Sequence, residues 1–183
     1  MSAATFALPG APRVGLWVFM GVISALFGLF SIAYLMRMAM ADWHALPIVP
    51  WQLWLSTALL AASSLAWEGA RRGVQAAFAS AYGLSVAFIA VQLWAWRIMT
   101  DWHFTVDANP ANSFFYLITG LHGLHVLGGL AAAAFVGARG GAGVALCARY
   151  WHFLLALWLA MFGLLFGVTP EFVQLVCNTI LPK

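Results

Sequence analysis

Five long stretches of the chain contain no charged residue, and they limit what it can fold into more than any other feature. They cover residues 14–36, 51–67, 74–96, 114–138 and 150–169. An α-helix rises 1.5 Å per residue, so about 20 residues cross the ~30 Å hydrocarbon core of a membrane. Polar and apolar residues do not alternate here, as they would in strands of a membrane barrel. We predict an all-α, polytopic membrane protein, a five-transmembrane-helix bundle that forms a single membrane domain over residues 1–183.

The composition agrees with a protein that is mostly dissolved in lipid. Hydrophobic residues make up 64% of the chain and charged residues 7%, whereas soluble domains carry roughly 25% charged residues. These values exclude an ordinary soluble enzyme, a disordered tail and a small disulfide scaffold. The basic residues are scattered between the apolar stretches, so we expect no nucleic-acid partner. The first stretch is longer than the core of a secretory signal, and we expect it to be a retained span.

The basic residues between the stretches predict the orientation of the chain. Five lie on the side of the N-terminus: Arg13, Arg71, Arg72, Arg139 and Arg149. Three lie on the opposite side: Arg37, Arg97 and Lys183. Because cytoplasmic segments carry the excess of Lys and Arg, we expect a cytoplasmic N-terminus and an external C-terminus. This topology places Cys147, in the link before the last helix, and Cys177 on opposite sides of the membrane, too far apart for a disulfide.

Six tryptophans lie near the ends of the stretches. They are Trp17, Trp51, Trp67, Trp94, Trp96 and Trp151. Tryptophan is enriched at both membrane–water interfaces, because its ring is apolar and its N–H is polar. The positions therefore predict aromatic belts at the two faces of the bundle.

Three histidines are the candidate ligands of the stretches. His122 and His125 are three residues apart on one predicted helix, so they share a face, and His152 opens the last helix. Imidazole is a common ligand of haem and of metal ions. However, His125 lies about 16 Å along its helix from the external side while His152 has barely entered from the cytoplasmic side, an axial gap of roughly 10 Å or more. We therefore expect structural, hydrogen-bonding roles between helices and no metal site.

The other polar residues of the stretches are uncharged. No Asp or Glu lies inside any of the five, although a proton or ion carrier usually needs an ionisable group within the membrane. This argues against a stand-alone transporter. We expect Thr119 and Gln92 to form structural polar contacts between helices, and we expect no catalytic residue in this chain.

Small residues recur at a spacing of four, which lets helices approach closely in lipid. The pairs are Gly21 with Ala25, Ser24 with Gly28, Gly129 with Ala133 and Gly137, and Gly163 with Gly167. We expect dense packing along these faces, either within the chain or against a partner.

One stretch carries a long motif. Its residues are Phe114-Phe115-Tyr116-Leu117-Ile118-Thr119-Gly120-Leu121-His122-Gly123-Leu124-His125-Val126. The run resembles the FY-x-x-TG-x-HG-x-HV signature of the subunit III family of haem-copper oxidases. Further matches follow the family's order in the other stretches: Gly15-x-Trp17-x-Phe19, Ser56-Thr57 with Ser63-Ser64, Gln92, and Tyr150-Trp151-His152-Phe153 followed by Trp158. The resemblance covers most of the chain.

The chain departs from the family pattern at three polar positions. Ile23 and Ala95 stand where the family usually has glutamates, and Leu155 stands where it usually has an aspartate. The departures indicate a divergent branch, and we do not carry the family's proton handling over to this chain.

The resemblance implies the short, five-helix bacterial form of cytochrome c oxidase subunit III, in the bacterial inner membrane. Such a chain is a non-catalytic subunit of a proton-translocating terminal oxidase in aerobic respiration, fed by cytochrome c or quinol. It stabilises subunit I beside subunit II, and the haem and copper belong to those partners. It needs no cofactor of its own but binds phospholipid in a cleft between its first two helices and the other three. The lipid contacts that we expect are Trp17, Arg71, Arg72 and Arg149.

Two other interpretations stay open at this point. The first is an accessory subunit of nitric oxide reductase, whose family is similar and to which the run Leu8-Pro9-Gly10 points. The second is an independent haem-binding membrane cytochrome that uses His122 or His125.

Overall fold

The computed structural model describes residues 11–38, 40, 42–44, 49–74, 76–169 and 173 of the chain. This part of the chain is helical and contains five helices: α1 (Ala11–Arg37), α2 (Trp51–Arg71), α3 (Ala77–Asp101), α4 (Pro110–Ala138) and α5 (Val144–Gly167). Each helix overlaps one of the five predicted stretches. The all-α prediction is therefore confirmed for the described residues.

The helix ends are set by local backbone chemistry rather than by the last uncharged residue. Asn109 caps α4, because its side chain accepts a hydrogen bond from the Ala111 N–H, and Pro110 occupies the first turn. Between α4 and α5, Gly140, Gly141 and Gly143 all have positive φ, which glycine adopts at no steric cost.

This early turn corrects two predictions about the last helix. Because α5 begins at Val144 instead of residue 150, Cys147 lies within the helix and is buried. His152 accordingly lies in the third turn of α5 rather than at its start. Cys177 lies outside the described residues.

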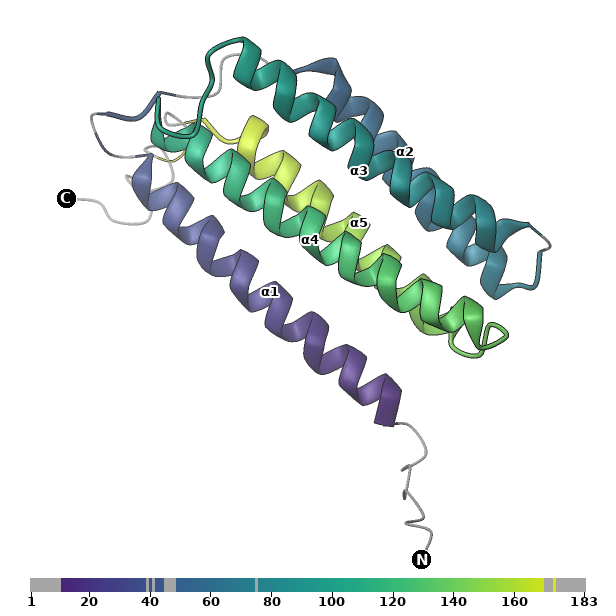
Figure 1. Cartoon of the computed structure of the whole chain (residues 1–183). Coiled ribbons are helices and arrows are strands. Elements are labelled where there is room, and N and C mark those ends of the chain that lie inside the picture. Colours follow the sequence, from purple (N-terminus) through teal and green to yellow (C-terminus); the bar gives the residue numbers. More distant parts are fainter. Residues whose placement is uncertain are drawn as a thin grey trace, which may run out of the picture.

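The helices form three layers (Figure 1). α4 and α5 lie in the middle, α1 packs on one side of them, and the α2–α3 pair packs on the other. α2 lies along α3 and also contacts α5, while α3 contacts α4. We expected a cleft between the first two helices and the other three. This arrangement is wrong, because α2 packs away from α1 in the described part of the chain.

Four of the five helices are long and apolar enough to cross a membrane. Among the described residues these are α1, α3, α4 and α5, and they make the chain a multi-pass membrane protein. α2 is 21 residues long, but polar side chains interrupt its apolar sequence. Those side chains are turned inward: Gln52, Ser56, Ser63 and Ser64 are all buried. The low apolar content of α2 therefore reflects its polar inner face.

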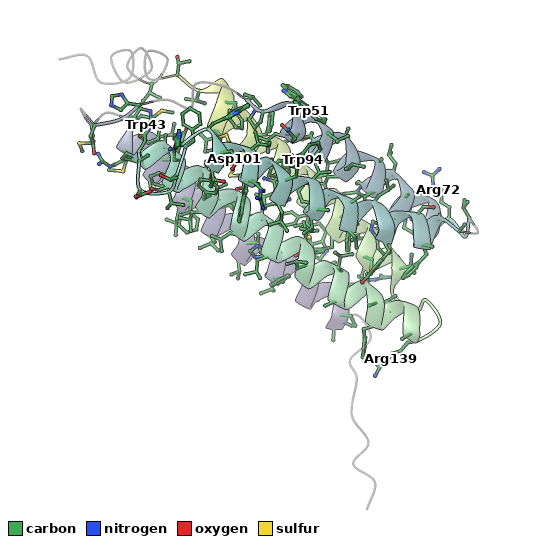
Figure 2. The ribbon with its side chains drawn as sticks, turned by 45° about the horizontal axis from the view of Figure 1, so that its top comes forward. Trp43, Trp51, Arg72, Trp94, Asp101 and Arg139 are labelled. Atoms are coloured by element: carbon green, nitrogen blue, oxygen red, sulfur yellow. The ribbon has the colours of Figure 1, made fainter. Side chains whose placement is uncertain are left out.

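The two ends of the bundle differ in character. Figure 2 shows Arg72 and Arg139 at one end, and Trp51 and Asp101 toward the other. Trp67 and Trp151 do not fit the predicted aromatic belts, because both are fully buried, whereas Trp17 and Trp51 are exposed. The Trp67 and Trp151 rings pack together with their centroids 4.7 Å apart. They belong to the core because α2 and α5 meet there.

The small residues of α4 allow close packing within the chain. A Cβ atom on Gly129 would lie 2.8 Å from the Tyr150 ring of α5, and one on Gly137 would lie 2.9 Å from the Phe78 ring of α3. By contrast, a Cβ on Gly21, Gly28 or Gly163 would meet no described atom within 4 Å. The predicted dense packing within the chain is thus confirmed for α4, while the small residues of α1 and α5 lie on open faces.

Candidate functional site

Buried hydroxyl groups join α5 of the middle layer to the α2–α3 pair. Ser63 of α2 and Ser85 of α3 lie 2.7 Å apart through their hydroxyl oxygens. The indole N–H of Trp151 on α5 donates to the Ser85 hydroxyl at 2.8 Å. Because a polar group in the membrane interior must find a partner within the protein, this chain of bonds fixes the register of the helices.

A second set of bonds crosses the bundle nearer its other end. The Trp158 indole on α5 donates to the Thr57 hydroxyl on α2 at 2.8 Å, and the Ser56 hydroxyl donates to the Gln92 side-chain oxygen on α3 at 3.3 Å. Gln92 is buried and so links α3 to α2. Thr119 of α4 accepts a bond from the Trp96 indole at 3.0 Å, which links α3 to α4.

His122 lies in the aromatic centre of the bundle. It is fully buried, with its ring 5.8 Å from that of Phe88 on α3 and 5.1 Å from that of Trp158 on α5. Neither ring nitrogen has a hydrogen-bond partner among the described residues.

His125, three residues along α4, contacts α1 instead. Its ring lies 6.3 Å from that of Phe19 and 5.7 Å from that of Phe27. Nδ1 lies 2.7 Å from the Leu121 carbonyl oxygen of its own helix. The two histidines that share a motif therefore contact different layers of the protein.

His152 belongs to a charged cluster at the end of the bundle that carries Arg72 and Arg139, the basic end. Its Nδ1 lies 2.5 Å from the Ser64 hydroxyl, and its Nε2 lies 3.7 Å from a Glu68 carboxylate oxygen. Arg71 donates to that carboxylate from Nε at 2.7 Å, and Arg72 donates from Nε at 2.9 Å. These hydrogen bonds, Arg71 first, lower the pKa of Glu68 from 4.5 to about 2. The cluster ties the end of α2 to α5.

The four expected lipid contacts lie in different settings. Arg71 and Arg72 are paired with Glu68, so part of their hydrogen-bonding capacity is already used. Arg149 is exposed on α5, and Trp17 is 64% exposed on α1. The structure does not gather the four residues into one site.

A large cavity separates α1 from the middle layer near the basic end. It has a volume of about 850 Å³, and its wall is almost wholly apolar. Leu16 and Phe19 line it from α1, His125 and Gly128 from α4, and Tyr150 from α5. The small residues of α4 predicted dense packing, so this cavity was not expected from the sequence.

The positions that depart from the family pattern are apolar in their surroundings too. Ile23 and Ala95 are buried in the core, and Leu155 packs against it. Among the described residues, no group of three or more His, Cys, Asp or Glu side chains could hold a metal ion.

Comparison with known proteins finds relatives that are named probable cytochrome c oxidase subunit 3. Over 94 residues the chain is 31% identical to a protein of Mycobacterium tuberculosis named probable cytochrome c oxidase subunit 3. This alignment covers 46% of each chain, so it spans about half the length of that relative. A protein of Mycobacterium leprae with the same name is 36% identical over 73 residues, which is 35% of this chain and 36% of the relative.

A third relative aligns over a longer range. The probable cytochrome c oxidase subunit 3 of Nocardia farcinica is 28% identical over 165 residues, covering 77% of this chain and 79% of the relative. No family model matches the chain.

Proposed function

We propose that this chain is a non-catalytic subunit III of a bacterial haem-copper terminal oxidase. The observation that carries the proposal is the similarity to the Nocardia farcinica protein, which extends over 77% of the chain. Residues that carry the motif resemblance also hold the bundle together: His122 packs against Trp158, and Trp151 bonds to Ser85. The chain therefore retains the motif residues as packing and hydrogen-bonding elements.

In this role the chain acts by packing beside subunits I and II, which carry the haem and copper of the oxidase. It stabilises subunit I during aerobic respiratory electron transport, with cytochrome c or quinol as the electron donor. Its open glycine faces on α1 and α5 support such packing, because helices approach most closely where side chains are small.

The proposal includes the topology of the short, five-helix form. α2 crosses the membrane like the other four helices, since it lies along α3 and its polar residues face inward. The end with Arg72 and Arg139 faces the cytoplasm of the bacterial cell, in accordance with the positive-inside rule.

The proposal also includes bound phospholipid at this basic end. Arg149 is the strongest of the four expected lipid contacts, because it is exposed and makes no ion pair within the described part of the chain. A guanidinium group there pairs well with a lipid phosphate. Trp17, exposed on α1, adds an aromatic contact at the same end.

Purification of the tagged chain from its native membrane in mild detergent tests the function. We expect subunits I and II of the oxidase to co-purify, as identified by mass spectrometry, and the complex to show haem absorption. Recovery with nitric oxide reductase subunits would favour the alternative partner, whose sequence pointer at residues 8–10 lies outside the described part of the chain. Recovery without any haem-protein partner would contradict the proposal.

One variant sharpens this test. In His122→Gln, the haem spectrum of the purified complex is expected to stay unchanged, because His122 packs between protein rings. Loss of a haem band in this variant would instead identify His122 as a ligand.

A further inference from the structure

We propose that the cavity between α1 and the α4–α5 layer is a binding site for a hydroquinone with a hydrocarbon tail. The inference concerns a ligand of this chain itself and goes beyond its proposed role as an oxidase subunit. It concerns binding alone, without electron transfer.

The hydrogen bond of His125 fixes the chemistry of the site. A carbonyl oxygen only accepts, so Nδ1 must donate to the Leu121 carbonyl. In the neutral imidazole the other nitrogen, Nε2, is then an acceptor. Nε2 has no hydrogen-bond partner among the described residues, and it is not among their buried unpaired atoms. His125 lines the cavity, so the site offers an acceptor that a ligand hydroxyl can satisfy.

The depth of His125 excludes most sources of a hydroxyl group. His125 lies near the middle of α4, about 20 Å from either end at 1.5 Å per residue. The hydroxyl and phosphate groups of ordinary lipids stay near the polar surface of a bilayer, because the hydrocarbon core offers them no partners. A matching ligand must therefore carry its O–H into the core on a largely apolar body.

The walls of the cavity favour a flat ring. Phe19 and Tyr150 line it and are stacked on each other, with centroids 6.0 Å apart and an angle of 29° between their planes. On the α4 side, Gly128, Gly129 and Ala132 leave a smooth surface with little side chain. Aromatic rings associate through stacked and edge contacts, so a phenolic ring suits this site better than an aliphatic alcohol.

The volume leaves room for a tail as well as a ring. At about 850 Å³, the cavity lies within the usual range for small-molecule sites, roughly 300–1,000 Å³. It continues from His125 past Val136 and Leu146 toward Pro12, near the start of α1. This path is apolar and fits a hydrocarbon chain that runs from the centre of the bundle toward its basic end.

Photo-crosslinking of the full-length chain in nanodiscs of phosphatidylcholine and phosphatidylglycerol tests the proposal. The probe is a decyl hydroquinone with a diazirine at the end of its tail, kept reduced under argon. We expect crosslinks on residues of the cavity wall, competed by unlabelled decyl hydroquinone. The oxidised quinone has no O–H and should compete about tenfold less well, the usual effect of one lost hydrogen bond. Equal competition by the quinone, by decanol or by added phospholipid would overturn the proposal.

Four variants complete the test. His125→Phe removes the acceptor and should lower labelling about tenfold, whereas His125→Gln restores a carbonyl acceptor and should retain most of it. Gly128→Leu fills the cavity without a backbone clash, since a Cβ there meets no described atom within 4 Å, and should abolish labelling. Gly163→Leu is the matched control on an open face of α5. Equal labelling of Gly128→Leu and Gly163→Leu would refute the site even if His125→Phe failed to fold.

Discussion

Ionisable residues in this protein depend on the charged and polar side chains around them. Glu68 is the clearest case, because two arginines of its own helix end and one histidine of α5 surround its carboxylate. With its pKa lowered to about 2, the Glu68 carboxyl group is ionised at neutral pH. The cluster therefore adds stability through the charged form of Glu68.

This pKa predicts how stability changes with pH. A carboxyl group whose pKa falls on folding contributes its full stability above the ordinary value of 4.5 and loses it as the pH falls toward about 2. We compare the melting temperatures of the wild type and Glu68→Gln in detergent micelles over this range. The wild type should melt higher above pH 4.5, and the difference should shrink toward zero in acid. A difference that is constant across the range would show that the charge of Glu68 plays no part.

At the scale of helices, close approach depends on small residues at particular positions. Gly129 is such a position, because Tyr150 and Trp151 of α5 occupy the space that a larger side chain would need. Ser63 represents another kind of contact, since it is buried and bonded to Ser85 and to the Ala81 carbonyl. The missing side chain at Gly129 lets α4 and α5 approach closely, and the hydrogen bonds of Ser63 join α2 to α3.

Gly129→Leu is expected to destabilise the chain more than Ser63→Ala does. Overpacking against the two rings costs about 1–3 kcal/mol. Ser63→Ala removes two hydrogen bonds to α3, and an interhelical hydrogen bond in a membrane protein contributes only about 0.6 kcal/mol. Unfolding of the purified variants in detergent measures both values. Gly28→Leu is the control, because it adds the same side chain on an open face of α1. If Gly129→Leu unfolds like this control, the close contact between α4 and α5 is misplaced.

For the whole molecule, the layered arrangement determines which ends of the helices lie together. Arg72 and Arg139 lie at one end, and Trp51 and Asp101 lie toward the other, although the chain passes between the ends several times. In the proposed orientation, the end with Arg72 and Arg139 faces the cytoplasm.

Single cysteines introduced into a cysteine-free variant report this topology. Trp51→Cys and Asp101→Cys should react with a membrane-impermeant maleimide added to intact spheroplasts. Arg72→Cys and Arg139→Cys should react only after the membrane is opened. The Trp51 and Arg72 positions bracket α2, so their labelling from the same side would mean that α2 does not cross the membrane. If Arg72→Cys and Arg139→Cys react in intact spheroplasts and the other two react only after the membrane is opened, the proposed orientation is wrong.

The positions of the helices and the membrane class followed from the sequence alone. Hydropathy and helix length are local properties, so the five uncharged stretches predicted where helices occur, and only their ends shifted. Turn glycines account for the largest shift, because the positive φ of Gly143 ends the α4–α5 link before Val144.

The partners of the polar residues were decided only by the tertiary structure. Ser64 and His152 lie 88 residues apart in the sequence yet share a hydrogen bond. His122 and His125 lie three residues apart, yet His125 packs against Phe27 of α1 and His122 packs against Phe88 of α3. The cavity beside His125 likewise brings together residues of α1, α4 and α5 that are distant in the sequence. The physical reason is that packing between distant segments selects which face of each helix turns inward, and no local pattern contains that choice.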